Sequence, residues 1–413
     1  MKTQSYSSTP FAVVEGTRAI AEWLPDDKDG VFVSLKGDEI MRSQIFKIGD
    51  LELRSNPAFV RLVKAGVVGS PEDLDLTANY EYTYDRTVAY LRRAVWLSAD
   101  MEYYAVASYV ALTWAFQAFD CVPYLRFTGD FGVGKTTALK AVASLAYRPV
   151  VTTGVLRTAP IFRLADRLKS TFLFDEADFG TTSAVSDLFK LLNCGYSKGS
   201  PVIRLDSKYE PRMFDVFGPK VIAARELFAD LALESRCLNI EMRSRNHGLE
   251  PLSSPAMQQE ATAIRNGFLS VRLKNRIAPY PEDEEVIIER LLESRFDARV
   301  IQIALPLMHS TPDLHRETLA DFLGGAKYNY RRLYRETIHG QILSAYLESG
   351  LERCRLTTIK KYLDVSSVQH TTLKSIAVAA VRMGFDKDHT REGAIISSPS
   401  DEWLTSVRRI YNV

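Results

Sequence analysis

Short apolar runs alternate with amphipathic stretches between about residues 123 and 245. The apolar runs are PYLRFTG, PVVTTG, STFLFDEAD, GPKVIAARE and CLNIEMR, and the stretches KTTALKAVASLA and TAPIFRLADRLK carry apolar residues at helical spacing. Strands that alternate with helices are typical of a parallel sheet, because each parallel connection needs a crossover. The pattern therefore predicts an α/β core with a five-stranded parallel sheet.

The segments on either side of this core follow different patterns. Residues 1–70 alternate apolar and polar positions in short runs broken by Asp-Gly and Gly-Asp pairs, which predicts a small β-rich region. Residues 71–122 take helical spacing and lead into the core, and residues 246–338 are predicted to form a helical lid or linker. Residues 339–413 show three helical stretches and then a strand-like tail. That order predicts a C-terminal winged-helix domain.

Composition narrows the classes of protein that fit this pattern. The chain has 413 residues, of which 46% are hydrophobic and 25% charged, as in an ordinary globular protein. A formal net charge of +1 excludes a polycationic chain, so any nucleic-acid site must be a local basic surface. The four cysteines form no CxxC pair, which argues against a zinc site and favours the reducing cytoplasm. The uncharged stretch 103–119 is short for a bilayer span of about 20 residues, so a buried helix is predicted there and no membrane contact.

The loop after the first core strand reads GDFGVGKT and matches the phosphate-binding pattern GxxxxGK[ST]. Glycines let backbone N–H groups turn inward and surround phosphates at the positive end of the following helix. Lys135 would contact the β- and γ-phosphates, and the Thr136 hydroxyl would be a ligand of Mg²⁺. ATP and Mg²⁺ are therefore the predicted cofactors. The predicted nucleotide-binding residues are Gly129, Asp130, Phe131, Gly132, Val133, Gly134, Lys135, Thr136 and Thr137.

The third core strand ends in an acidic pair, Asp175 and Glu176. In a P-loop fold this strand end faces the phosphate loop across the crevice at the edge of the sheet, so Asp175 is predicted to bind Mg²⁺. Glu176 is predicted to polarise the attacking water. The alternative is a plain helix cap, for which Asp178 is a further candidate.

These residues suggest a family. The run from residue 105 to residue 307 resembles the P-loop ATPases that phages and integrative elements encode beside primase and helicase modules. The matching pieces are PYLRFTGDFGVGKTTAL, FLFDEAD, LLNCGYSKGSPVIR, VFGPKVIA, LESRCLNIEM and ARVIQIALPL, of which LLNCGYSKG and VFGPK are the more diagnostic. The arrangement also looks, more distantly, like minichromosome-maintenance and superfamily-3 helicases, which are AAA+ rings. The resemblance implies an AAA+-like homo-oligomer, expected to be a hexamer, with single-stranded or forked DNA and a primase or other replication proteins as partners.

A predicted hairpin carries part of the likeness to those helicases. The stretch VIRLDSKYEPRMFDVF forms two alternating runs around a turn, directly before the fourth core strand. The helicases place at this location a hairpin that grips DNA with a basic tip. In this chain the tip would be Lys208, flanked by Arg204 and Arg212.

The winged-helix pattern carries the other part of the likeness. Lys360, Lys361 and Lys374 lie on or near its two later helices and are predicted to contact DNA. Acidic residues such as Asp364 dilute this basic character, and winged helices also serve as protein-interaction modules.

Three arginines would complete the catalytic set formed with Lys135 and Glu176. Arg236 precedes the fifth strand, where ring-forming ATPases present an arginine finger to the ATP of the next subunit; the alternative is a solvated helix end. Arg225 follows the fourth strand, where a sensor residue contacts the γ-phosphate, although AAR replaces the usual small polar residue. Arg299 lies where a second sensor would come.

The leading hypothesis is a DNA-dependent ATPase that acts as a ring-forming replicative helicase of a phage or mobile genetic element. One alternative is an ATP-switched DNA-binding or assembly regulator without unwinding activity. A second is a protein-remodelling AAA+ ATPase, which the basic hairpin tip with its single Tyr209 disfavours.

Overall fold

The chain divides into two compact units, residues 1–323 and 324–413, and each is described by itself. The computed structural model describes residues 6–7, 11–14, 19–26, 30–36, 39–48, 51–55, 57–153, 158–175, 183–205, 209–225, 228, 231–243, 248–274, 287, 298–336, 338–365, 372–390 and 393–411.

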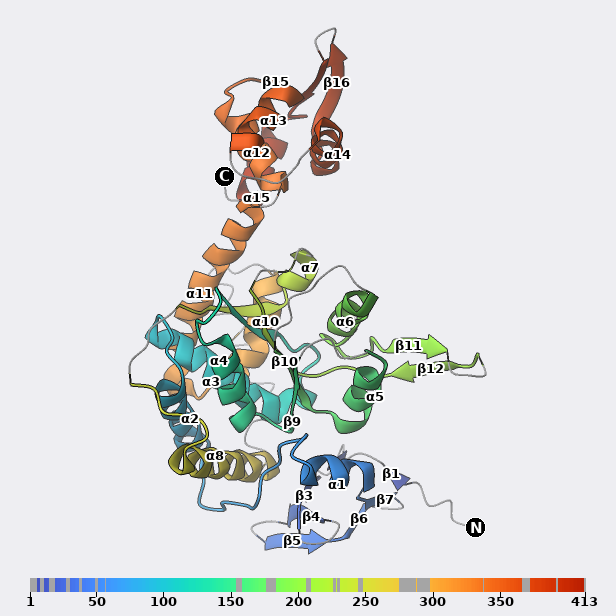
Figure 1. Ribbon diagram of the computed structural model, residues 1–413, viewed down its shortest axis with the longest axis vertical. Coiled ribbons are helices and arrows are strands. Elements are labelled where there is room, and N and C mark those ends of the chain that lie inside the picture. Colours follow the sequence, from blue (N-terminus) through green and yellow to red (C-terminus); the bar gives the residue numbers. More distant parts are fainter. Residues whose placement is uncertain are drawn as a thin grey trace. The chain divides into compact units, whose positions relative to one another are not determined.

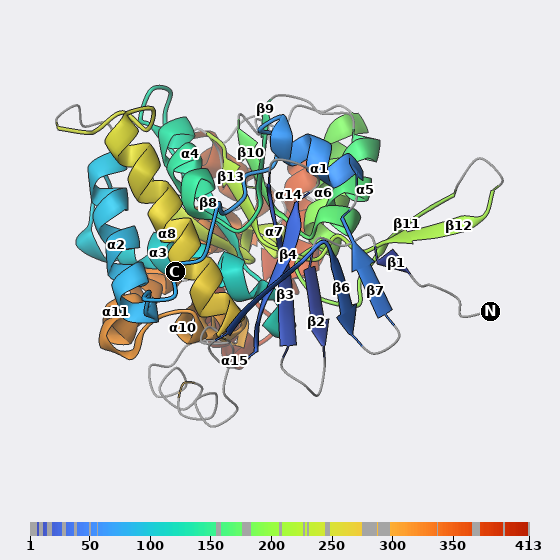
Figure 2. The same ribbon diagram turned by 90° about the horizontal axis from the view of Figure 1, so that it is seen from below.

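The first unit is built on a parallel sheet with the strand order β14-β8-β13-β10-β9. Figure 1 labels β9 and β10 of this sheet, and Figure 2 labels β8 and β13 as well. These five strands are the five apolar runs of the sequence, and their parallel registers confirm the predicted sheet. Strand β13 lies between β8 and β10, so one strand separates the strand that leads into the phosphate loop from the strand that ends at Asp175. The strands are β8 Tyr124–Thr128, β9 Pro149–Thr153, β10 Thr171–Asp175, β13 Lys220–Ala223 and β14 Cys237–Glu241.

Helices cover both faces of this sheet, because successive strand side chains point to opposite faces and enter two hydrophobic clusters. One cluster joins the sheet to α2 Tyr80–Ala94, α3 Asp100–Ala115, α4 Lys135–Leu145, α8 Pro255–Leu273, α10 Ala298–His309 and the start of α11 Asp313–Glu336. The other joins it to α1 Pro57–Lys64, α5 Thr158–Leu168, α6 Ser183–Cys194 and α7 Leu231–Glu234. Figure 2 shows α2, α4 and α8 on one side and α1, α5 and α6 on the other.

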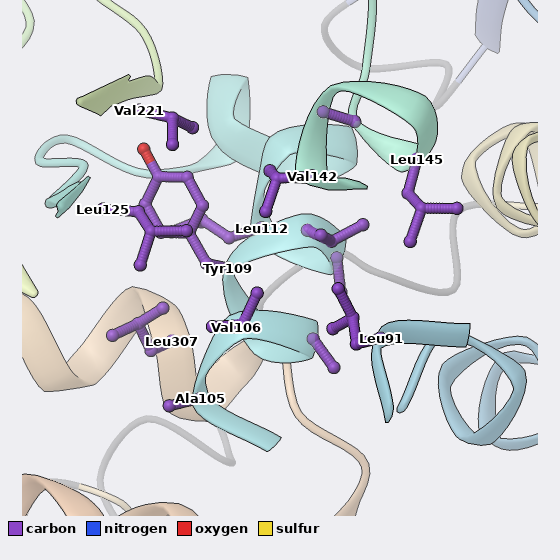
Figure 3. Close-up of a cluster of buried hydrophobic side chains, with 14 of the residues drawn as sticks. Leu91, Ala105, Val106, Tyr109, Leu112, Leu125, Val142, Leu145, Val221 and Leu307 are labelled. Carbon is purple, nitrogen blue, oxygen red and sulfur yellow. The ribbon is translucent and has the colours of Figure 1, made fainter. Parts of the chain in front are cut away.

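Helix α3 lies at the centre of the first cluster. Figure 3 shows Tyr109 of this helix beside Leu125 of β8 and Val221 of β13. The Tyr109 hydroxyl donates to the Lys220 carbonyl at 2.8 Å, and the Trp114 indole donates to the Leu145 carbonyl at 3.0 Å. The uncharged stretch therefore forms a buried core helix, as predicted; it continues into the short 3₁₀ helix Phe116–Ala118. Within the described part of the chain, no helix has both the length and the apolarity needed to cross a membrane.

The N-terminal strands form two small sheets, with the orders β2-β3-β4-β5 and β1-β7-β6. A buried carboxylate fixes the larger sheet to the core: Glu22 accepts from Arg148 at 2.6 Å, from Arg272 at 2.6 Å and from the Tyr147 hydroxyl at 3.0 Å. The strands are β1 Tyr6–Ser7, β2 Phe11–Val14, β3 Ala19–Leu24, β4 Val31–Lys36, β5 Glu39–Ser43, β6 Ile45–Ile48 and β7 Leu51–Arg54.

The second unit has its own hydrophobic core and a three-stranded antiparallel sheet of order β15-β17-β16. In chain order its elements are α12 Ile338–Glu348, β15 Arg353–Arg355, α13 Leu356–Val365, α14 Leu373–Met383, β16 Asp386–Thr390, β17 Gly393–Ser397 and α15 Asp401–Tyr411. Three helices thus precede a β-hairpin. The assignment of this unit as a winged helix stays a prediction, as does the division of the chain into five segments.

A buried lysine braces the start of β13. Lys220 is 1% exposed, and its ammonium donates to the carbonyls of Gly195, Val216 and Gly218 at 3.3, 2.9 and 2.9 Å. A Cβ at Gly195 would lie 2.7 and 2.8 Å from the carbonyl oxygens of Val216 and Leu191, which explains the first glycine in LLNCGYSKG. Burial lowers the pKa of Lys220 from 10.5 to about 7.

This pKa predicts a pH dependence of stability. Between pH 7 and pH 10.5 the unfolded chain binds a proton that the folded chain lacks, so the free energy of unfolding should rise with pH. Between pH 7 and pH 9 we expect a rise of about 2–3 kcal/mol. Urea unfolding of wild type, Lys220→Met and the exposed control Lys140→Met should show this slope in wild type and control only. An equal slope in all three proteins would contradict the assignment.

Candidate nucleotide-binding site

The phosphate loop connects β8, which ends at Thr128, with α4, which begins at Lys135. All three of its glycines, Gly129, Gly132 and Gly134, adopt backbone conformations that other residues rarely take. Gly129 has φ +139°, and a Cβ there would lie 2.5 Å from the Met242 carbonyl oxygen. Gly134 has φ +93° and is the N-cap of α4. The strand–loop–helix arrangement therefore depends on glycine at these positions.

The start of α4 is suited to an anion. Gly134 provides no side-chain cap, and the first turn of the helix contains no acidic residue. The positive end of the helix dipole, formed by the first backbone N–H groups, is therefore not neutralised by a carboxylate of this turn. The Lys135 Nζ donates to the carbonyls of Gly129 and Asp130 at 2.7 and 2.6 Å. These bonds place the ammonium across the loop, where the β- and γ-phosphates of a nucleotide would lie.

Two oxygen donors meet beside this loop. The Thr136 Oγ1 donates to the Asp175 Oδ1 at 2.9 Å, although the residues lie on α4 and β10. An octahedral Mg²⁺ with ligands at 2.0–2.1 Å separates adjacent oxygens by about 2.9 Å. A hydroxyl and a carboxylate at this spacing therefore fit two neighbouring positions of a Mg²⁺ shell. Carboxylate oxygens are ligands that Mg²⁺ prefers.

Arg225 lies at the same edge of the sheet. It follows β13, and its guanidinium carbon is 5.9 Å from the centre of the Phe131 ring, which is 86% exposed at the phosphate loop. The carboxyl ends of β8, β13 and β10 thus bring together Lys135, Arg225 and Asp175.

Of the other predicted site residues, two are exposed at the phosphate loop and two have side chains outside the described set. Asp130 and Thr137 are exposed on the loop and on the first turn of α4. Glu176 lies outside the described residues, and Arg299 is the second residue of α10, with a side chain outside the described set. Their roles stay predictions.

Arg236 lies at the opposite edge of the sheet. Its carbonyl accepts from the Tyr124 N–H at 2.9 Å, where β8 begins, whereas the phosphate loop follows the other end of β8. Five residues of a parallel strand rise about 16 Å, so the Arg236 side chain is far from the phosphate loop of its own chain. It donates to the Asn193 Oδ1 at 2.6 Å and lies 5.2 Å from the centre of the Tyr196 ring.

The predicted hairpin is present as β11 Val202–Leu205 and β12 Pro211–Phe214, and it projects from the first unit in both views (Figures 1 and 2). Arg204 and Arg212 are directly opposite each other, so both point to one face. The guanidinium of Arg204 lies 4.9 Å from the centre of the Phe162 ring. Lys208, the predicted tip, lies outside the described residues.

The lysines predicted to contact DNA in the second unit differ in their surroundings. Lys360 forms an ion pair with Asp364 at 2.6 Å, which reduces its local positive charge. Lys361 and Lys374 are exposed, and the exposed surface of α14 also contains Val378 and Val381. This helix therefore combines basic and apolar positions.

A buried ion pair on β8, the strand that leads into the phosphate loop, was not predicted from the sequence. Arg126 of β8 and Glu234 of α7 are 0% and 2% exposed and form a direct ion pair. The available signal was an arginine inside an apolar strand, because buried charges are rare unless they are paired.

Comparisons with known proteins give distant likenesses. No family model and no curated protein matches the chain. It is similar to the solved structure of JCV helicase with a bound inhibitor, with 16% identity over 57% of this chain and 67% of that chain and a TM-score of 0.28. It is also similar to the apo NrS-1 C-terminal region, with 9% identity over 92% of this chain and 95% of that chain and a TM-score of 0.36. At these identities, what the chain does has to be inferred from its own residues.

Proposed function

We propose that this protein is a DNA-dependent ATPase that forms a ring and acts as a DNA helicase. The observation that carries the proposal is the 2.9 Å contact between Thr136 and Asp175 beside the phosphate loop, because it pairs the two oxygens that Mg²⁺ of a bound nucleotide requires. ATP would bind with its phosphates on the N-terminus of α4.

The residues around the loop have separate tasks in this proposal. Lys135 and the backbone N–H groups of the loop bind the β- and γ-phosphates, and Arg225 senses the γ-phosphate. Thr136 and Asp175 would be the ligands of Mg²⁺, which neutralises charge on the phosphate oxygens when bound. Glu176, which directly follows Asp175, would orient the attacking water.

Arg236 is proposed to act on a neighbouring subunit. It lies at the edge of the sheet opposite its own phosphate loop, so it cannot complete the site of its own chain. An arginine finger supplied by the next subunit would instead stabilise the charge that develops on the phosphate during hydrolysis.

The hairpin β11–β12 is proposed as the DNA contact. It extends from the unit, and Arg204 and Arg212 present two positive charges on one face. Guanidinium groups donate several hydrogen bonds in a planar fork that matches phosphate, so two arginines on one face suit a contact with the DNA backbone.

Replacing Arg212 with glutamine tests the DNA contact. We expect DNA-stimulated ATP hydrolysis to fall at least tenfold while DNA-free hydrolysis stays unchanged, because the hairpin is remote from the phosphate loop. One lost phosphate contact should also lower the salt slope of single-stranded DNA binding by about 0.7. The measurements are phosphate release with and without DNA, and DNA affinity across salt concentrations.

The matched control is Arg42→Gln, an exposed arginine in the N-terminal sheet that pairs with Asp73. It should leave both measurements unchanged. If wild-type hydrolysis does not respond to DNA, the motor proposal fails and a protein-directed ATPase becomes the better interpretation. If DNA binds more tightly with ATP but forked DNA is never unwound, the chain is an ATP-switched DNA-binding protein.

A further inference from the structure

The buried ion pair joins β8 to α7, the short helix that precedes Arg236. Arg126 belongs to β8 and is located three residues before Gly129, the first residue of the phosphate loop. Its partner Glu234 is the last residue of α7, two residues before Arg236. The pair therefore connects the strand that leads into the nucleotide site with the residues that lead into Arg236.

Both oxygens of the Glu234 carboxylate are used. One accepts from Arg126 and from the Asn239 amide at 2.8 Å, and the other accepts from the Phe228 backbone N–H at 2.9 Å. Arg126 in turn donates to the Asn239 Oδ1 at 3.0 Å and lies 4.6 Å from the centre of the Phe228 ring. One carboxylate thus holds Phe228 and α7, the described parts of the stretch 228–234, on β8.

The neighbours of this stretch are the two arginines proposed to contact ATP. Arg225 lies beside Phe131 of the phosphate loop, three residues before Phe228. Arg236 donates its N–H to the Leu233 carbonyl at 3.0 Å, so its backbone continues directly from α7. A displacement of the end of β8 by a nucleotide at the phosphate loop would therefore reach Arg236 through the ion pair and α7.

Stability alone does not account for two buried charges at this place. Removing an ion pair from water costs several kcal/mol, and apolar residues of similar volume often stabilise a core as well or better. What an ion pair with directional hydrogen bonds provides is a defined geometry, in this case between β8, Phe228 and α7.

We infer that Arg126 and Glu234 are positioning residues that couple the nucleotide in one subunit to the arginine finger which that subunit presents to its neighbour. The inference rests on the proposed shared ATP site and adds a regulatory link to it. Nucleotide at the phosphate loop fixes the end of β8, the ion pair holds α7 against that strand, and Arg236 takes its position for the next site.

Glu234→Gln tests the link, because glutamine keeps the size and one acceptor but loses the charge. We expect ATP turnover to fall about 10- to 100-fold with an unchanged Kd for nucleotide, since the phosphate loop is intact. The double variant Glu234→Gln/Arg236→Ala should turn over no more slowly than Arg236→Ala alone, because both changes remove the same contribution. Asn239→Leu, which keeps volume but loses the bridging amide, should act in the same direction if Glu234→Gln folds poorly.

Glu22→Gln is the matched control, because it weakens an equally buried ion pair in the N-terminal sheet. It should lower stability without changing turnover of the folded protein. The inference would be overturned if Glu22→Gln lost as much turnover as Glu234→Gln, or if the two losses multiplied in the double variant. Neither result would contradict the proposed shared ATP site. An unchanged turnover in Arg236→Ala itself would instead overturn the shared site, and the coupling with it.

Discussion

Replacing Asp175 with asparagine should lower ATP turnover about 10²- to 10³-fold, because it removes the anionic ligand of Mg²⁺ next to the phosphate loop. Asparagine has nearly the same volume and keeps an Oδ1 that can accept from the Thr136 hydroxyl, so the 2.9 Å contact and the fold should survive. Nucleotide affinity without Mg²⁺ should not change, because Lys135 and the loop N–H groups are untouched.

Phosphate release measured against Mg²⁺ concentration, together with binding of a fluorescent nucleotide, separates these effects. The variant should need more Mg²⁺ for half-maximal turnover. Asp313→Asn is the control, since Asp313 has an exposed side chain at the start of α11. A variant with wild-type turnover and the same Mg²⁺ requirement would show that Asp175 only accepts the hydrogen bond of the Thr136 hydroxyl.

The sheet could be predicted because its three central strands, β8, β13 and β10, are buried on both faces. Such strands are continuous apolar runs, and the helices between them leave a different period in the sequence. The strand order β14-β8-β13-β10-β9 could not be predicted in the same way, since it depends on how helices cross the sheet. That order decides which strand ends share an edge with Lys135.

The nucleotide site was predictable where a local motif determines backbone geometry. Gly129 and Gly134 adopt positive φ values, and the sequence marks them through the spacing of the phosphate loop. Glu234 leaves no such mark, because its partner Arg126 is distant in the sequence and the ion pair forms only when α7 packs on the sheet. The far-edge position of Arg236, in contrast, follows from its place directly before β14, because that strand runs parallel to β8.

The position of Arg236 leads to the second large effect. Arg236→Ala should lower ATP turnover about 10³-fold or more while leaving nucleotide affinity unchanged, as expected of an arginine finger. Arg236→Lys should not restore the rate, because lysine lacks the planar fork that binds a phosphate through two donors. Because the Arg236 side chain is far from its own phosphate loop, the lost activity belongs to the neighbour's site.

Mixed oligomers test this assignment. Lys135→Ala subunits have a defective phosphate loop but an intact finger, and Arg236→Ala subunits have the reverse. When the two inactive proteins are mixed in equal amounts, about a quarter of the sites should combine an intact loop with an intact finger if subunits assemble at random. Lys135→Ala mixed with Asp175→Asn should recover nothing, because both lesions lie in the same half of the site. Failure of the first mixture to recover activity, in oligomers shown to contain both proteins, would mean that each chain hydrolyses ATP without its neighbour's arginine.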